Sequence, residues 1–325
     1  LFMSYQVTIQ PSGHSFDVEP SESVLDAALR QGIILPYGCR NGACGSCMGT
    51  VAGGSVEYPD GPPAALTTAD AARQQALFCQ ARAASDLTIQ VREVDAARDI
   101  EIRTLPCRVN KLEHLAHDVI RIYLKLPDTE RLQFLAGQYI DVLLKDHAPR
   151  SFSIANAPHD DSLIELHIRN VSGGYFSAQV FNQMQEKDML RFEGPLGTFF
   201  LREDSDRPAI LIGGGTGFAP LKGILEHAFH TGIEKPLHLY WGVRAKRDLY
   251  LEELPARWLQ DHTNFSYTPV LSEPMPEDNW TGATGFVTNR VIRHYPDLSG
   301  YDIYMSGPRV MVEAGHKLFM QYGLD

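Results

Sequence analysis

The spacing of the cysteines constrains the fold of this 325-residue chain more than any other feature of its sequence. Three of the five cysteines form the loop Cys39-x4-Cys44-x2-Cys47, and the next cysteine is Cys79. Three ligands on one loop with a distant fourth are typical of a [2Fe–2S] site. Zinc is the alternative metal, but structural zinc sites usually pair their ligands in two short units, and disulfides are rare in reducing compartments. We therefore expect Cys39, Cys44, Cys47 and Cys79 to bind a [2Fe–2S] cluster.

The residues around this loop predict a small β-grasp domain over 1–95. The N-terminal segments alternate like a β-hairpin around a Pro-Ser-Gly turn, and residues 23–32 predict a helix. Gly38, Gly42 and Gly45 lack a Cβ, so the backbone can pass close to a cluster. We expect backbone N–H groups of the loop to donate to sulfur.

Length and composition limit the functional classes. A chain of this length usually forms two or three domains. The sequence has no apolar run long enough to span a membrane and no secretion signal, so we expect a cytoplasmic protein. The net charge of −11 argues against a nucleic-acid partner. An acidic surface can steer a basic partner protein toward the chain or simply keep the chain soluble.

Residues 96–105 are charged and lack periodicity, which predicts a linker. Residues 106–204 then contain short strand-like runs separated by turn residues. That pattern predicts a small antiparallel β-barrel with one helix at 175–184.

Three clusters within this predicted barrel suit a nucleotide cofactor with a flat ring. Arg150 can pair with a pyrophosphate, and Phe152 can stack on a ring. Glycines directly precede the predicted helix, and a helix N-terminus favours phosphate. Each of these groups of residues is weak evidence alone. Together, and after a segment that is expected to bind an iron–sulfur cluster, they are stronger evidence for a nucleotide cofactor. The clusters are Arg150-Ser151-Phe152-Ser153, His167-Ile168-Arg169 and Gly173-Gly174-Tyr175-Phe176-Ser177.

The spacing of apolar residues changes over residues 205–325. Apolar strands alternate with helices, which predicts a doubly wound α/β domain with ligands at the carboxyl ends of its strands. The turn at 213–217 follows an apolar strand and precedes a helix with Pro220 near its start. It is not a G-x-G-x-x-G turn because position 218 is Phe, and no Gly-Lys-Ser/Thr follows as in a P-loop.

Taken together, these motifs resemble those of three-module flavin reductases of the ferredoxin–NADP reductase superfamily with an N-terminal plant-type ferredoxin domain. Residues 150–153 resemble the flavin signature Arg-x-Tyr-Ser/Thr, with Phe152 in place of Tyr. Residues 214–220 resemble the nicotinamide-side Gly-Gly-Thr-Gly-x-x-Pro turn. Residues 306–308 resemble the later Cys-Gly or x-Gly-Pro element, with Ser306 where the family often has Cys.

The resemblance implies a role for each matching residue. Arg150 would bind the FAD pyrophosphate, Phe152 would pack on the isoalloxazine, and Ser153 would lie near its reactive nitrogen. Thr216 and Ser306 would lie at the nicotinamide, so Ser153, Thr216 and Ser306 are the candidate catalytic residues. The other candidate cofactor-binding residues are Ser151, His167, Ile168, Arg169, Gly173, Gly174, Phe176, Ser177, Gly214, Gly215, Gly217, Pro220, Arg244, Gly307 and Pro308.

The resemblance also implies an activity. NAD(P)H delivers two electrons as a hydride and a [2Fe–2S] cluster accepts one, so FAD is expected between them. We expect electrons to leave the cluster for a partner redox protein, an oxygenase component. The alternatives are a CDP-6-deoxyhexulose 3-dehydrase in deoxysugar synthesis and a non-catalytic redox-sensing role. Arg244, Lys246 and Arg247 could bind the 2′-phosphate of NADPH, but we favour NADH.

Overall fold

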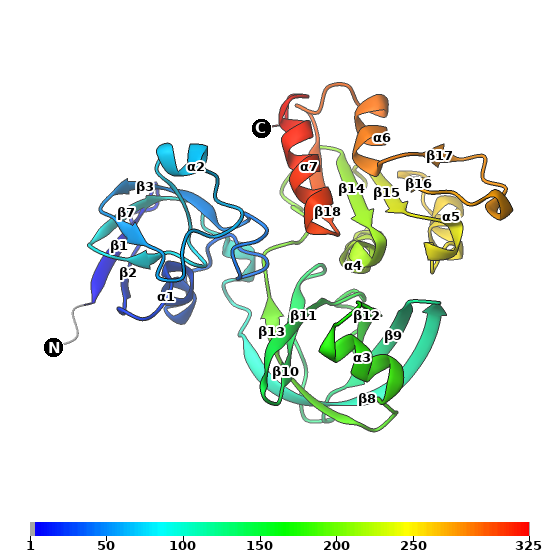
Figure 1. Cartoon of the computed structure of the whole chain (residues 1–325), viewed down its shortest axis with the longest axis horizontal. Helices are drawn as coiled ribbons and strands as arrows, with labels where there is room; N and C mark the ends of the chain where they lie inside the picture. The colour runs from blue at the N-terminus through cyan, green and yellow to red at the C-terminus, as the bar shows by residue number, and fades with distance from the viewer. Residues whose placement is uncertain (1–3, 325) are drawn as a thin grey trace. The chain divides into compact units, whose positions relative to one another are not determined.

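The computed structural model describes residues 4–324, which divide into two compact units (Figure 1). The first unit comprises residues up to 101 together with 196–199, and the second comprises 102–195 and the residues from 200 onward. No helix in the described part of the chain is long and apolar enough to cross a membrane.

The first unit is built on a five-stranded mixed sheet in the order β2-β1-β7-β3-β5. β1 and β2 form the predicted hairpin, and β7 pairs with β1 in parallel. Ser23 caps helix α1 by accepting a hydrogen bond from the Asp26 N–H. A small mixed sheet with helix α1 against it is the predicted β-grasp fold. Its elements are β1 (Tyr5–Gln10), β2 (Ser15–Val18), α1 (Val24–Arg30), β3 (Met48–Gly53), β4 (Val56–Glu57), α2 (Thr68–Ala72), β5 (Gln75–Leu77), β6 (Arg82–Ala83), β7 (Leu87–Gln90) and the 3₁₀ turn η1 (Asp95–Ala97).

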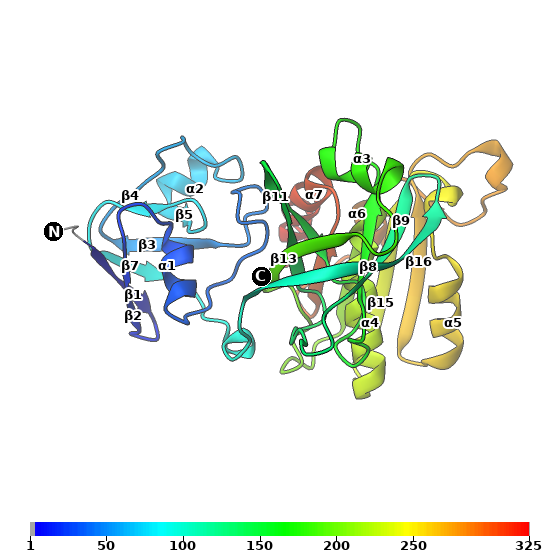
Figure 2. The ribbon, with the colours of Figure 1, turned by 90° about the horizontal axis from the view of Figure 1, so that it is seen from below.

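The first half of the second unit is the antiparallel barrel, with strand order β11-β10-β13-β8-β9-β12. Figure 2 shows its long paired strands β8 and β9. β8 begins at Arg103, within the segment predicted to be a linker. Even-numbered residues of β12 enter the barrel core, so Glu165, His167 and Arg169 lie on its other face. The elements are β8 (Arg103–Ala116), β9 (Val119–Lys125), β10 (Tyr139–Leu144), β11 (His147–Ser153), β12 (Ile164–Arg169), α3 (Tyr175–Asn182) and β13 (Met189–Leu196).

The second half of this unit is a parallel sheet in the order β17-β16-β15-β14-β18 (Figure 1). Ile210 and Ile212 of β14 face helices α6 and α7, whereas Gly213 faces α4. Helices therefore cover both faces, as predicted for a doubly wound domain. The elements are β14 (Ala209–Gly214), η2 (Gly215–Gly217), α4 (Phe218–Thr231), β15 (Leu237–Val243), η3 (Lys246–Asp248), α5 (Glu253–Asp261), β16 (Phe265–Leu271), η4 (Pro276–Asp278), β17 (Ala283–Thr284), α6 (Val287–His294), β18 (Asp302–Ser306) and α7 (Arg309–Met320).

Candidate functional site

The cysteine loop of the first unit brings its thiols together. The Cys39 and Cys44 thiols interact with one another, and so do those of Cys47 and Cys79. The interaction within the first pair lowers the pKa of Cys44 to about 5 and raises the pKa of Cys39. The interaction within the second pair lowers the pKa of Cys47 and raises the pKa of Cys79. The four sulfurs that would bind a cluster therefore lie close enough to interact in pairs.

Backbone N–H groups of the loop point at the cysteine sulfurs. The N–H groups of Ala43 and Cys44 both lie 3.3 Å from the Cys39 sulfur, and the Cys39 N–H lies 3.4 Å from the Cys44 sulfur. Gly42 has a φ of 75°, and a Cβ there would lie 2.5 Å from the Pro63 side chain. The predicted N–H donation to sulfur is thus present, and the donor set fits a [2Fe–2S] cluster.

A distant segment anchors the start of the cysteine loop. Thr198 belongs to the same unit as the loop. Its hydroxyl accepts from the Tyr37 N–H at 3.0 Å and donates to the Tyr37 carbonyl, also at 3.0 Å. The Thr198 N–H donates to that carbonyl as well, at 3.0 Å. Tyr37 is thereby fixed two residues before the first cysteine ligand.

In the barrel, β11 presents the flavin signature on an open surface. Residues 147–151 are all exposed, and Phe152 and Ser153 are half-buried. The Arg150 guanidinium donates only to nearby backbone carbonyls, those of Ala148 and Pro149, among the contacts of the described residues. An exposed cationic strand with an aromatic ring at its end can accept a flavin and its pyrophosphate, so the residues fit FAD.

Helix α3 lies beside this strand. The Phe176 and Phe152 rings are 5.3 Å apart, and the exposed Tyr175 stacks on His147 at 3.8 Å. Gly174 caps the helix without a side chain, so no side-chain cap bonds to the N-terminal N–H groups, and a helix N-terminus favours a phosphate. Gly173, with a φ of 75°, makes the turn that precedes the helix.

Three other predicted cofactor residues have structural partners instead. His167 is fully buried and bonds to Glu165 at 2.8 Å and to the Tyr250 hydroxyl at 3.0 Å. Ile168 lies in the barrel core, and the Ser177 hydroxyl bonds to carbonyls of the turn before α3. Their partners inside the protein, rather than an open surface, account for their positions.

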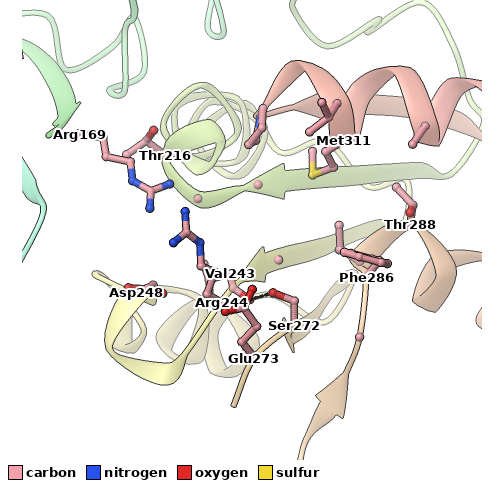
Figure 3. A pocket seen from close by; sticks show the side chains of 18 of the residues that line it. Arg169, Thr216, Val243, Arg244, Asp248, Ser272, Glu273, Phe286, Thr288 and Met311 are labelled. Atoms are coloured by element: carbon pink, nitrogen blue, oxygen red, sulfur yellow. Dashed lines mark hydrogen bonds between the residues drawn. The ribbon is translucent and has the colours of Figure 1, made fainter. Parts of the chain in front are cut away.

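The nucleotide turn borders a cavity of about 650 Å³ in the second unit. Arg169, Thr216 and Arg244 lie around one end of the cavity, and Phe286, Thr288 and Met311 lie around the other (Figure 3). The lining also includes Asp118, Gly214, Gly215, Ser272, Glu273, Val287 and Pro308. Asp118 accepts a hydrogen bond from Arg169 at 2.8 Å, which holds the Arg169 side chain at this end.

Close backbone contacts bring the two nicotinamide-side motifs together. A Cβ on Gly217 would lie 2.1 Å from the Ser306 carbonyl oxygen, and one on Gly214 would lie 2.9 Å from Pro308. Gly307 in turn lies against the backbone of Gly214. Of the predicted residues, Pro220 is buried in the first turn of α4, where it shapes the helix rather than the cavity.

Sequence reasoning missed several residues of the cavity, and Glu273 and Phe286 are the two that matter most for a nucleotide. Glu273 follows β16, and its N–H donates to the Arg244 carbonyl at 2.8 Å, which places both residues at one sheet edge. Phe286 precedes α6 and is 71% exposed, unusual for so large an apolar side chain. Their positions at the carboxyl ends of parallel strands were the available signal. Of the three residues predicted to bind a 2′-phosphate, namely Arg244, Lys246 and Arg247, Arg244 alone is among the residues that line this cavity.

Three family models together match most of the chain. A 2Fe-2S iron-sulfur cluster binding domain matches residues 7–84, an oxidoreductase FAD-binding domain matches 106–201, and an oxidoreductase NAD-binding domain matches 211–317.

Full-length relatives share this order of domains. The chain is 38% identical over 322 residues to a CDP-6-deoxy-L-threo-D-glycero-4-hexulose-3-dehydrase reductase of Yersinia pestis, covering 99% of this chain and 96% of that protein. It is 34% identical over 324 residues to a terephthalate 1,2-dioxygenase reductase component of Comamonas sp, with 99% and 95% covered. The crystal structure of the Amycolatopsis cytochrome P450 reductase GcoB superposes with a TM-score of 0.78 at 33% identity, covering 99% of this chain and 96% of that one.

These matches agree with the cysteine loop, the open flavin strand and the nucleotide cavity. The chain therefore belongs to the family of NAD(P)H-dependent iron–sulfur flavoprotein reductases, oxidoreductases that pass electrons from NAD(P)H through FAD and a [2Fe–2S] cluster to a partner protein.

Proposed function

We propose that the partner protein is an oxygenase component. The observation that carries this proposal is the full-length similarity to reductases named for a dioxygenase and for a cytochrome P450. The cysteine loop is suited to such a partner, because Asn41 and Ser46 are exposed and Cys39 and Cys44 are only half-buried. A partner can therefore approach the cluster ligands directly.

The roles of the residues that bind FAD are part of this proposal. We assign the pyrophosphate to Arg150 and to the N-terminus of α3 behind Gly173 and Gly174. Ser151 and Phe152 support the flavin along β11, and Ser153 lies next to its reactive edge. When bound, FAD supplies the two-electron to one-electron conversion that the cluster requires.

The nicotinamide is assigned to the narrow region between Thr216 and Ser306. Gly214, Gly217 and Gly307 allow their backbones to meet there, since none of them carries a Cβ. Arg169 and Arg244 face the same end of the cavity and can pair with the dinucleotide phosphates (Figure 3).

We further propose that NADH is preferred over NADPH. The carboxylate of Glu273 lies in the cavity lining beside Arg244. A carboxylate in this position can accept a hydrogen bond from a ribose 2′-hydroxyl and repels a 2′-phosphate. Phe286, exposed within the lining, offers a face on which the adenine can stack.

The functional modules are proposed to follow the sequence motifs. Residues 1–95 would carry the cluster, 106–204 the flavin and 205–325 the nucleotide, with 96–105 as the connection. Residues 196–199 are added to the module that carries the cluster, since they belong to the same compact unit and Thr198 bonds to Tyr37.

The proposal is tested by reconstitution with purified acceptors. NADH, the reductase and an iron-containing aromatic-ring oxygenase are combined, and product is measured against NADH consumed. Coupled product formation supports an oxygenase partner. The proposal would be refuted if the reductase oxidises NADH with ferricyanide as acceptor and supports the dehydrase reaction, but supports none of the oxygenases that are tested.

A dehydrase partner is the second candidate, favoured by the 38% identity to the Yersinia reductase. In the same experiment, a CDP-6-deoxyhexulose 3-dehydrase replaces the oxygenase, and formation of the 3-deoxy sugar is measured. The two acceptors compete for one reductase, so the ratio of their turnover rates decides between them.

A further inference from the structure

Helix α4 carries a lysine that is buried between the barrel and the nucleotide sheet. Lys222 is 5% exposed, and lysines are almost never so buried unless they are paired. Its ammonium donates to the Ala155 carbonyl at 3.2 Å, to Glu165 at 3.0 Å and to Glu226 at 3.0 Å. These three bonds use all three N–H groups of the lysine.

Two of these acceptors belong to the barrel. Ala155 follows Ser153 by two residues, and Lys222 follows Thr216 by six. The ammonium therefore ties the segment that leaves the flavin strand to the helix that leaves the nucleotide turn. Every other lysine side chain in the described residues is at least partly exposed.

The helix and the barrel segment also meet through their backbones. A Cβ on Gly223 would lie 2.9 Å from the Asn156 carbonyl oxygen and 3.4 Å from that of Ile154. This contact admits only a glycine at the position after Lys222. The buried ion pairs thus stand at a place where the two backbones are already in contact.

The same network reaches the nucleotide turn by a second path. The second oxygen of Glu165 accepts from His167, whose other ring nitrogen lies 3.0 Å from the Tyr250 hydroxyl. Tyr250 packs edge-on against Trp241 at 5.1 Å. The Trp241 indole N–H donates to the carbonyl of Gly215, next to Thr216, at 2.9 Å.

The neighbours of Glu165 hold its negative charge. Burial alone would raise the pKa of Glu165, but the His167 hydrogen bond and the Lys222 charge lower it to about 2. Burial lowers the pKa of His167, so the ring is neutral, donates to Glu165 and accepts from Tyr250. Glu165 therefore stays ionised and remains a permanent partner for the lysine.

We propose that Lys222 is a positioning residue for hydride transfer: it sets the spacing between the flavin strand at Ser153 and the nicotinamide turn at Thr216. This inference rests on the proposed placement of flavin and nicotinamide at those two residues. Transfer between two held rings depends steeply on their separation, and a displacement of about 1 Å can cost about 100-fold in rate.

The test replaces Lys222 by Met, which keeps the length of the side chain and removes the ammonium. Anaerobic stopped-flow measurements follow the loss of flavin absorbance after mixing with NADH. We expect Lys222→Met to retain FAD and the iron–sulfur spectrum and to bind NADH with unchanged affinity. The rate of flavin reduction should fall by about tenfold or more, with a larger isotope effect for deuterated NADH.

Two further variants keep the inference falsifiable. If Lys222→Met does not fold, the double variant Lys222→Gln/Glu165→Gln removes both charges and leaves a neutral pair that can still hydrogen-bond. Lys235→Met is the control, because Lys235 is a half-buried lysine whose ammonium donates to the backbone carbonyls of Arg202 and Ser205, and neither of these residues belongs to β11 or β12.

The outcomes separate the inference from the function on which it rests. If the flavin of the folded Lys222 variants is reduced by NADH at the rate of the unaltered protein, the role of Lys222 is refuted and the proposed function stands. Slow reduction by the Lys235 control as well would overturn it too, because the effect would then be general. If NADH does not bleach the flavin of the unaltered protein, the proposed placement itself fails.

Discussion

The contact between Gly217 and Ser306 gives the sharpest prediction. Gly217 has φ −59° and ψ −11°, a conformation that alanine adopts without strain. An added Cβ would nevertheless lie 2.1 Å from the Ser306 carbonyl oxygen and 2.4 Å from its carbon. Real Cβ contacts are not shorter than 3.0 Å, so the two backbones must separate by about 0.9 Å (3.0 − 2.1).

This displacement lies between the two motifs assigned to the nicotinamide. Overpacking of this kind costs about 1–3 kcal/mol of stability, which a folded enzyme usually survives. A shift of nearly 1 Å at the reacting groups is expected to lower the rate of flavin reduction by about 10- to 100-fold. We therefore expect Gly217→Ala to remain folded, with FAD and cluster bound, but to be reduced slowly by NADH.

Stopped-flow reduction of the flavin measures this effect, with thermal unfolding measured in parallel. Gly300→Ala is the matched control, because a Cβ at Gly300 meets nothing within 4 Å and φ there is not in the left-handed region. If Gly217→Ala is reduced as fast as Gly300→Ala, the close approach of the two motifs has no part in hydride transfer, and the assignment of the nicotinamide fails.

Three further predictions address other parts of the molecule. Cys44→Ser should lose iron and the iron–sulfur absorption while NADH still bleaches the flavin; unchanged iron content would contradict the ligand set. Glu273→Gln should lower the ratio of kcat/KM for NADH to that for NADPH by about tenfold, since a charge-assisted hydrogen bond contributes about 1.5–3 kcal/mol; an unchanged ratio would remove Glu273 from cofactor selection. Burial, followed by the nearby His294, lowers the pKa of His238 from 6.5 to about 4, so the unfolded chain binds the extra proton and stability should fall as pH drops from 6.5 toward 4. The loss is about 2 kcal/mol after allowance for partial exposure. Urea unfolding followed by tryptophan fluorescence should show a smaller acid loss in His238→Gln, and equal losses would show that another group titrates.

The sequence was sufficient to predict the elements whose function depends on local spacing. The cysteine loop at 39–47, the Arg150 strand and the glycine turn before α4 follow from short motifs, because each acts through neighbours close in the chain, and Cys79 follows as the distant fourth ligand that such a loop implies. The paired strands of the barrel and the alternating strands and helices of the nucleotide domain were likewise predictable from periodicity.

The remaining residues depend on contacts between distant parts of the chain. His167 looked like a cofactor ligand from its motif, but Tyr250, 83 residues away, makes it part of a buried network. Glu273 and Phe286 have no motif, and only the parallel register of β15, β16 and β17 brings them to the cavity. A single sequence carries no signal for such long-range pairings.

The buried bonds of Lys222 also determine how this protein can be divided. The motifs change near residue 205, which invites expression of the flavin and nucleotide halves as separate fragments. A cut there would expose Lys222 and Gly223 on one fragment and leave Glu165 on the other without the lysine that bonds to it, with Arg121, 3.6 Å away, as its remaining cation. A buried carboxylate stripped of its partner is strongly destabilising. The two halves are therefore expected to be one cooperative folding unit, and limited proteolysis should release the cysteine domain long before it separates them.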